Sequence, residues 1–219
     1  MRTAAILPVK SFARAKRRLC SELAANDRRA LVESMFADAL VALGRVAALE
    51  RVIVVSGDHV AQRIAAGYGA NVVEDDERGH NTAAMRGIRF ALEQKVERAL
   101  LVPGDCPLLA PRDIEALLAH SGGERSALIV PDRHGTGTNA LLLTPPDVLA
   151  PSFGPDSRRR HLGDAQANDV PAEVVELDSL ALDVDTPDDL QALQRRLAGL
   201  HGGAAHTRGM LNQLMRARA

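Results

Sequence analysis

Aromatic side chains are scarce in this sequence. Phe, Tyr and Trp make up 2% of the 219 residues, and Trp is absent. Proteins that bind single-stranded nucleic acid commonly stack the bases on aromatic rings, so this class is disfavoured. The formal net charge of −1 also lacks the basic excess of a typical nucleic-acid-binding protein. We therefore expect no nucleic-acid partner.

Closely spaced cysteines and long apolar runs are missing as well. Cys20 and Cys106 are too far apart for a metal-binding or redox motif, which favours a reducing, cytoplasmic location. No stretch approaches the roughly 20 apolar residues of a transmembrane helix. The first apolar run, Ala4 to Val9, is too short for a signal peptide. A soluble protein without a membrane partner is the expectation.

Several catalytic and nucleotide-binding motifs are absent too. The sequence contains no GxxxxGK[ST] loop, no GxGxxG fingerprint and no GxSxG elbow. Its seven His form no HxxH or HxxxH pair, which argues against a His-rich zinc site. Cys106 follows a carboxylate, which would not lower the pKa of its thiol. Catalysis through a nucleophile–base pair is therefore not indicated.

What the sequence does contain is an alternation of strand-like and helical segments. Strand-like runs lie at residues 3–9, 51–56, 70–74, 99–102 and 126–131, and helical patterns lie between them. The helical pattern at 26–43 places Leu31, Met35, Ala39 and Leu43 on one stripe. This alternation predicts a three-layer α/β fold with helices on both faces of a mostly parallel, mixed sheet. After residue 130, TNALLLTP is strand-like and AEVVELDSLALDVD suggests two short strands, which indicates an antiparallel excursion.

Three aspartates follow apolar runs in two distant segments. Asp105 ends LLVPGD, and Asp183 and Asp185 end LALDVD. Open α/β sheets bind ligands at the carboxyl ends of their strands, and carboxylates two residues apart in an extended chain face the same way, roughly 6.6 Å apart. Such oxygen ligands, together with substrate phosphates, suit Mg²⁺. Helix capping explains residues 186–189 but gives Asp183 and Asp185 no role, so we predict a magnesium site formed by the three aspartates.

Other segments suggest anion binding. KSFARAKRR follows the first strand with five cations in nine residues, which could neutralise a triphosphate or form an ordinary solvated face. HGTGTN, with Thr138, is either a hairpin turn or an anion site, and FGPDSRRR combines Gly154 and Ser157 with three Arg. Asn81 could cap a helix or contact a base or ribose, and the cap is favoured as at least one of its roles. Magnesium and phosphate ligands together indicate displacement at phosphorus.

With these motifs the chain resembles the phospholactate guanylyltransferase family (CofC, called FbiD in actinobacteria) of coenzyme F-420 biosynthesis. The resemblance covers about residues 5 to 195, and HGTGTNALLL, FGPDS and DVDTPDDL occur in the family's order. It implies a GT-A-like, Rossmann-like nucleotidyltransferase domain over residues 1–200. It also implies transfer of GMP from GTP to a small phosphorylated carboxylic acid, with release of pyrophosphate. The acid would be 2-phospho-L-lactate, phosphoenolpyruvate or 3-phospho-D-glycerate, the first two slightly ahead.

The resemblance assigns roles to individual residues. The magnesium ligands, which are also catalytic, would be Asp105, Asp183 and Asp185. The contacts to the phospho-acid would come from Thr138, Gly154 and Ser157. The candidate GTP ligands are Lys10, Lys16 and Asn81, and Lys16 is also a catalytic candidate.

Two other functions stay open. A GT-A glycosyltransferase also pairs an Asp-x-Asp motif with a metal and a nucleotide, although the shortage of aromatic residues disfavours a sugar acceptor. A catalytically inactive nucleotide-binding protein is the second alternative, but it would not need both aspartate clusters. Release of pyrophosphate from GTP separates these functions.

The last segment, residues 201–219, is interpreted as a tail outside this domain. It contains no acidic residue and is predicted to form a weak helix or to be disordered. Four apolar side chains, Met210, Leu211, Leu214 and Met215, could form a stripe against a partner subunit and so permit a homodimer. We expect the catalytic site to work without the tail, because all three aspartates precede it.

Overall fold

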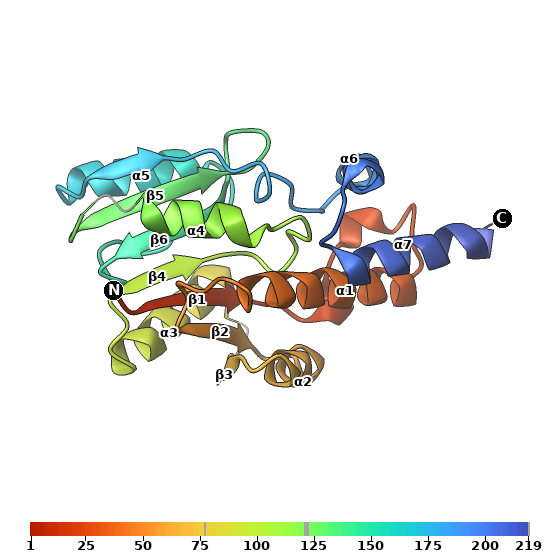
Figure 1. The fold of residues 1–219 in the computed structure, drawn as a ribbon, viewed down its shortest axis with the longest axis horizontal. Helices are drawn as coiled ribbons and strands as arrows, with labels where there is room; N and C mark the ends of the chain where they lie inside the picture. The colour runs from red at the N-terminus through yellow and green to blue at the C-terminus, as the bar shows by residue number, and fades with distance from the viewer. Residues whose placement is uncertain (77, 121–122, 219) are drawn as a thin grey trace.

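A mixed β-sheet forms the centre of the molecule (Figure 1). Its strands are β1 (Thr3–Pro8), β2 (Arg51–Ser56), β3 (Asn71–Glu74), β4 (Arg98–Leu101), β5 (Ser126–Pro131), β6 (Thr138–Thr144) and β7 (Ala172–Val174). The computed structural model describes residues 1–76, 78–120 and 123–218, and these strands pair in the order β3-β2-β1-β4-β6-β5-β7. Strand β6 runs antiparallel to β4 and β5, whereas the other pairs are parallel. The predicted antiparallel excursion is thus strand β6.

Helices cover both faces of the sheet. They are α1 (Ala25–Leu43), α2 (His59–Gly67), α3 (His80–Glu93), α4 (Pro111–Ala119), α5 (Ser157–Ala167), α6 (Pro187–Gly199) and α7 (Ala205–Arg218), with short 3-10 turns η1 (Phe12–Arg14) and η2 (Arg17–Leu19). Side chains of α1, α2, α4, α6 and α7 contribute to the core on one face of the sheet, and those of α3 and α5 contribute to the core on the other. Successive side chains of β1 alternate between the two cores, as the strand period of two requires. The predicted three-layer α/β fold is confirmed.

The predicted elements of the first 130 residues are present, with ends shifted by a few residues. The stripe predicted for α1 is fully packed, since Leu31, Met35, Ala39 and Leu43 are buried. None of the helices in the described ranges is both long and apolar enough to span a membrane. One local prediction is wrong: Asn81 does not cap a helix, because α3 begins at His80 with Gly79 as its N-cap.

A second short strand was also predicted before Asp183, and the structure has none there. Within AEVVELDSLALDVD only Ala172–Val174 pairs with the sheet, as β7. Leu180, Leu182 and Val184 are buried, but the carbonyl groups of Leu180 and Ala181 accept from the Asn139 side chain and the Arg133 N–H group. Side-chain and loop contacts therefore replace the ladder of a strand in this segment.

The C-terminal segment forms helix α7, which lies along α1 (Figure 1). Leu211 and Leu214 are buried in the core shared with α1, and the Asp38 carboxylate of α1 accepts the backbone N–H groups of His206 and Thr207 at 3.0 and 2.8 Å. Leu211 and Leu214 of the apolar stripe are therefore used within the chain, whereas Met215 is exposed, and the possible homodimer stays a prediction. That the tail is dispensable for catalysis stays a prediction.

Truncation of the buried leucine side chains of α7 is expected to destabilise the protein without affecting its reaction. Leu211→Ala combined with Leu214→Ala should lower the free energy of unfolding by roughly 3 kcal/mol or more, because both side chains are buried against α1. Met215→Ala is the control, since Met215 is 53% exposed and its loss should change stability by less than about 0.5 kcal/mol. Urea unfolding measures both. Equal stability of the two proteins would show that α7 does not pack on α1 in solution.

Candidate active site

Side chains from four segments meet at one edge of the sheet. Lys10 and Lys16 follow β1, and Asp105 follows β4, so they lie beyond the carboxyl ends of parallel strands. Because β6 is antiparallel to β4, its first residues lie at the same edge. The segment before α6 contributes two aspartates. All of them line one cavity of about 490 Å³: Lys10, Lys16, Asp105, Thr138, Asn139, Asp183 and Asp185.

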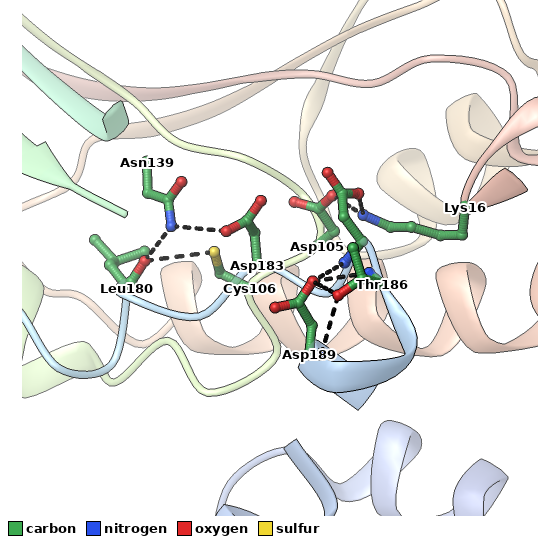
Figure 2. A network of polar contacts seen from close by, with 9 residues as sticks. Lys16, Asp105, Cys106, Asn139, Leu180, Asp183, Thr186 and Asp189 are labelled. Atoms are coloured by element: carbon green, nitrogen blue, oxygen red, sulfur yellow. Dashed lines mark hydrogen bonds and ion pairs between the residues drawn. The ribbon is translucent and has the colours of Figure 1, made fainter. Parts of the chain in front are cut away.

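Lys16 links the two aspartate clusters (Figure 2). Its ammonium group donates to the Asp105 carboxylate and, at 2.7 Å, to Asp185 Oδ1. The Lys16 side chain is 5% exposed, and its backbone is left-handed at φ 54°. Burial opposes a charge on Lys16, but the two carboxylates outweigh it and raise the pKa of the ammonium group above its ordinary value. Lys16 therefore stays charged inside the site.

The Asp183 carboxyl group has a raised pKa. Burial, followed by the charges of Asp105 and Asp185, raises its pKa to about 6. The Asn139 amide donates to Asp183 Oδ1 at 3.3 Å and opposes this shift (Figure 2). The Lys16 ammonium thus pairs with two of the three carboxylates, Asp105 and Asp185.

The chain direction at Asp185 is fixed by a helix cap. Thr186 caps α6, and its side chain and the Asp189 carboxylate form a capping box. Asp189 Oδ2 also accepts the backbone N–H group of Asp185 at 3.1 Å, and Asp189 Oδ1 pairs with Arg133 at 2.6 Å. Capping therefore does explain Thr186 and Asp189, as predicted, and it also holds Asp185 at the cavity.

The carboxylate groups of the three aspartates are suitable ligands for Mg²⁺, but in this structure they are not arranged as a metal site. Among the residues that the structure describes, no group of three or more His, Cys, Asp or Glu side chains is arranged to hold a metal ion. The Lys16 ammonium lies between Asp105 and Asp185 instead. Carboxylate oxygens are the ligands that Mg²⁺ prefers, and the pKa of Asp183 is raised first by burial and then by the charges of Asp105 and Asp185, which a cation would offset. The donor set therefore fits this ion.

The basic segment divides into two parts. Lys10 and Lys16 line the cavity, whereas Arg17 and Arg18 are exposed on η2. The side chain of Arg14, the remaining cation, lies outside the described part of the structure. The interpretation as a solvated face thus holds for the two exposed arginines, whereas neutralisation of a triphosphate by Lys10 and Lys16 stays a prediction.

Two of the three predicted phospho-acid ligands also line the cavity. Thr138 and Gly154 line it, with Gly154 at φ 121°, a conformation that favours glycine. Ser157 begins α5 and is buried, and its N–H group donates to the Gly154 carbonyl at 3.1 Å, but it is not among the cavity-lining residues. The wall thus offers a hydroxyl group and close backbone approach.

The segment Ser152–Gly154 is held by side chains from α3 and α5. Asn81 Oδ1 accepts the Phe153 N–H group at 2.8 Å, and Asn81 Nδ2 donates to the Phe153 carbonyl at 3.1 Å. Arg160 donates to the Ser152 carbonyl at 2.6 Å. Asn81 therefore positions this wall, and its contact with GTP stays a prediction.

Sequence reasoning missed His80, Phe153 and His161. His80 and Phe153 line the cavity, and the Phe153 ring lies edge-on between His80 and His161, 5.3 Å from each ring centre. Burial, and then the charge of Lys10, lowers the pKa of His80 despite the opposing effect of Asp105. Isolated histidines and a lone aromatic residue show no spacing that could have revealed this stack.

Acid is expected to destabilise the protein through His161. Burial lowers the pKa of His161 to about 4; Asp164 raises it and Arg160 lowers it, both from the same helix. The unfolded value is about 6.5, so the stability present above pH 6.5 is lost as pH falls toward 4, by up to roughly 3 kcal/mol. Urea unfolding of wild type and His161→Gln across this range measures the effect. A wild-type protein whose stability falls no more than that of the variant would contradict it.

Comparison with known proteins identifies the family. Residues 3–217 match the sequence model of a family described as guanylyl transferase CofC like. The chain belongs to this family. The match extends beyond residues 5–195, where the motifs lie, and includes α7. CofC membership makes the protein a guanylyltransferase and decides against the glycosyltransferase alternative.

Three CofC relatives differ in the acid that their names give. A phosphoenolpyruvate guanylyltransferase from Conexibacter woesei is 52% identical, over 99% of this chain and 98% of its own. A 3-phospho-D-glycerate guanylyltransferase from Colwellia psychrerythraea is 36% identical, over 88% and 91%. A 2-phospho-L-lactate guanylyltransferase from Methanothermobacter thermautotrophicus is 32% identical, over 98% and 92%.

Solved structures agree on the fold. A cytidylyltransferase from Leptospira borgpetersenii has a TM-score of 0.62 at 14% identity, covering 100% of this chain and 95% of its own. A nucleotidyl transferase from Methanothermobacter thermautotrophicus has a TM-score of 0.64 at 17% identity, covering 89% and 97%. The predicted Rossmann-like nucleotidyltransferase fold is therefore confirmed.

Proposed function

We propose that this CofC protein transfers GMP from GTP to phosphoenolpyruvate and releases pyrophosphate. One observation carries the proposal: Lys10, Lys16 and the three aspartates form one part of the wall of a single cavity of about 490 Å³, and Thr138 and Gly154 form another part. The first part suits a nucleoside triphosphate. The second part, Thr138 and Gly154, suits a small anion and is called the anion-binding wall below. The name of the relative that is 52% identical supports phosphoenolpyruvate among the three acids.

The reaction is a displacement at the α-phosphorus of GTP. A phosphate oxygen of the acid forms a bond to this phosphorus, and the bond from the phosphorus to the bridging oxygen of the β-phosphate breaks. The acceptor phosphate is already an anion near neutral pH, so no general base is needed. Lys10 and Lys16 would neutralise the triphosphate and the leaving pyrophosphate.

Magnesium is the cofactor that the donor set supports. Asp105, Asp183 and Asp185 would hold it, with Asn139 orienting Asp183. The ion would neutralise charge on the reacting phosphates. The protein's own contribution is to place these carboxylates at the cavity and to balance them with Lys16.

Location and partners follow the same chemistry. We propose a cytoplasmic protein whose partners are small molecules, GTP and the phospho-acid. Both cysteines are free thiols, Cys20 exposed and Cys106 buried, which agrees with a reducing compartment.

An assay with all three acids tests the function. Purified protein is incubated with GTP, Mg²⁺ and phosphoenolpyruvate, 2-phospho-L-lactate or 3-phospho-D-glycerate, and pyrophosphate release and product mass are measured. We expect the highest kcat/KM with phosphoenolpyruvate. Preference for another acid would change the substrate. Tight GTP binding without pyrophosphate release with any of them would instead support the inactive nucleotide-binding protein.

The two walls are expected to serve different substrates. Thr138→Val and Ser157→Ala should each weaken binding of the phospho-acid by about 1 to 3 kcal/mol, because each removes a hydrogen bond to an anion. KM for the phospho-acid should therefore rise, and KM for GTP should stay nearly unchanged. Thr144→Val, at the other end of β6 and equally buried, is the control for damage to the strand. Steady-state kinetics with each substrate varied in turn measures the effects. A rise in KM for GTP alone would reverse the assignment of the walls.

A further inference from the structure

His161 lies behind the anion-binding wall and joins its two parts. The side chain is fully buried on α5. Its Nδ1 atom lies 3.0 Å from Thr138 Oγ1, at the start of β6, and its Nε2 atom lies 3.0 Å from the backbone nitrogen of Ser152. The imidazole thus touches the strand and the loop that face the proposed phospho-acid.

The contact with Ser152 determines where the imidazole proton resides. A backbone N–H group can only donate, so Nε2 must be the unprotonated nitrogen that accepts. A neutral imidazole has one N–H group, which is then at Nδ1. The low pKa of the buried ring, about 4, keeps it neutral at physiological pH. His161 Nδ1 therefore donates to Thr138 Oγ1.

This direction leaves the Thr138 proton available. A hydroxyl group has one proton and two acceptor sites, and His161 occupies one acceptor site. In the described part of the chain, Thr138 Oγ1 has no second hydrogen-bond partner. Thr138 lines the cavity, so its hydroxyl proton can be directed at a bound anion. With the other tautomer the hydroxyl would donate to His161 and present only lone pairs, which repel an anion.

We propose that His161 is a positioning residue that makes the Thr138 hydroxyl a hydrogen-bond donor to the phospho-acid. This proposal depends on the proposed function only because that function identifies the bound anion as the phospho-acid. The same ring holds the N–H group of Ser152, so one side chain sets both the polarity of Thr138 and the position of the neighbouring loop. A purely structural histidine would have no reason to affect one substrate more than the other.

A double-mutant cycle tests whether His161 acts through Thr138. His161→Gln can still accept from Ser152 but loses the donor to Thr138, and it should raise KM for the phospho-acid about tenfold and KM for GTP less than twofold. In a Thr138→Val background, where the hydroxyl is already gone, the same change should add less than twofold. His161→Asn, whose amide can reach the Nδ1 position, should restore part of the affinity. His120→Gln, an exposed histidine, is the control.

Two results would overturn the proposal. One is an equal rise in KM for both substrates, or fold-changes that multiply in the double mutant. The other comes from the wild-type protein. Long-range ¹H–¹⁵N NMR at pH 7.5 should show a proton on Nδ1 of His161 and none on Nε2. A proton on Nε2 would contradict the proposal, even if the variants fail to fold. A wild-type enzyme that releases no pyrophosphate with any acid refutes the proposed function instead, which this NMR result does not depend on.

Discussion

Replacing any one of Asp105, Asp183 and Asp185 by Asn is expected to reduce kcat by at least about 100-fold. Each change removes a charged ligand from the proposed magnesium site, and neutralisation of the reacting phosphates is worth several kcal/mol, with tenfold in rate for every 1.36 kcal/mol. Pyrophosphate release from GTP at saturating phosphoenolpyruvate measures the loss.

Stability should separate this effect from damage to the fold. Asp183→Asn is expected to leave stability unchanged or to increase it, because burial and two neighbouring charges already raise the pKa of Asp183 to about 6. Asp188→Asn is the matched control, since Asp188 is exposed and only three residues from Asp185. It should keep near-normal turnover. If Asp183→Asn and Asp185→Asn together kept normal turnover, the site assignment would be wrong.

Lys16→Met is expected to lower both turnover and stability. Turnover should fall at least about 100-fold, because the cation that is proposed to face the leaving pyrophosphate is lost. Stability should fall by up to about 3 kcal/mol, because Asp105 and Asp185 lose their buried partner, although Asp185 is half exposed and partly screened by water. Kinetics and urea unfolding measure the two effects.

Lys95→Met is the control for this prediction. Lys95 is exposed and has a left-handed backbone at φ 59°, close to the 54° of Lys16, so both variants place Met in the same backbone conformation. The control should retain turnover and lose little stability. A Lys16→Met protein with the turnover of the control would remove Lys16 from the catalytic residues.

The sequence by itself determined the layers of the fold. The spacing of apolar residues along the chain is a local property. The strands and helices up to residue 130 could therefore be predicted from runs such as RVIVVS and from the stripe on α1. The motifs HGTGTNALLL, FGPDS and DVDTPDDL likewise indicated the family that the match over residues 3–217 shows. That Asp105, Asp183 and Asp185 lie together could be predicted because each follows an apolar run, and this pattern can be recognised in the sequence alone.

Only the tertiary structure decided what each polar side chain touches. Lys16 and Asp185 are 169 residues apart in the sequence, and no spacing rule joins them. The buried run before Asp183 looked like a strand because its alternation matches one, but the Asn139 side chain and Arg133 N–H bind its carbonyl groups instead. Asn81 and His161 acquire their roles from the Ser152–Gly154 loop, which they contact from separate helices on the same face of the sheet. Hydrogen bonds depend on distance and direction in space, and the sequence does not contain these until the sheet brings the segments together.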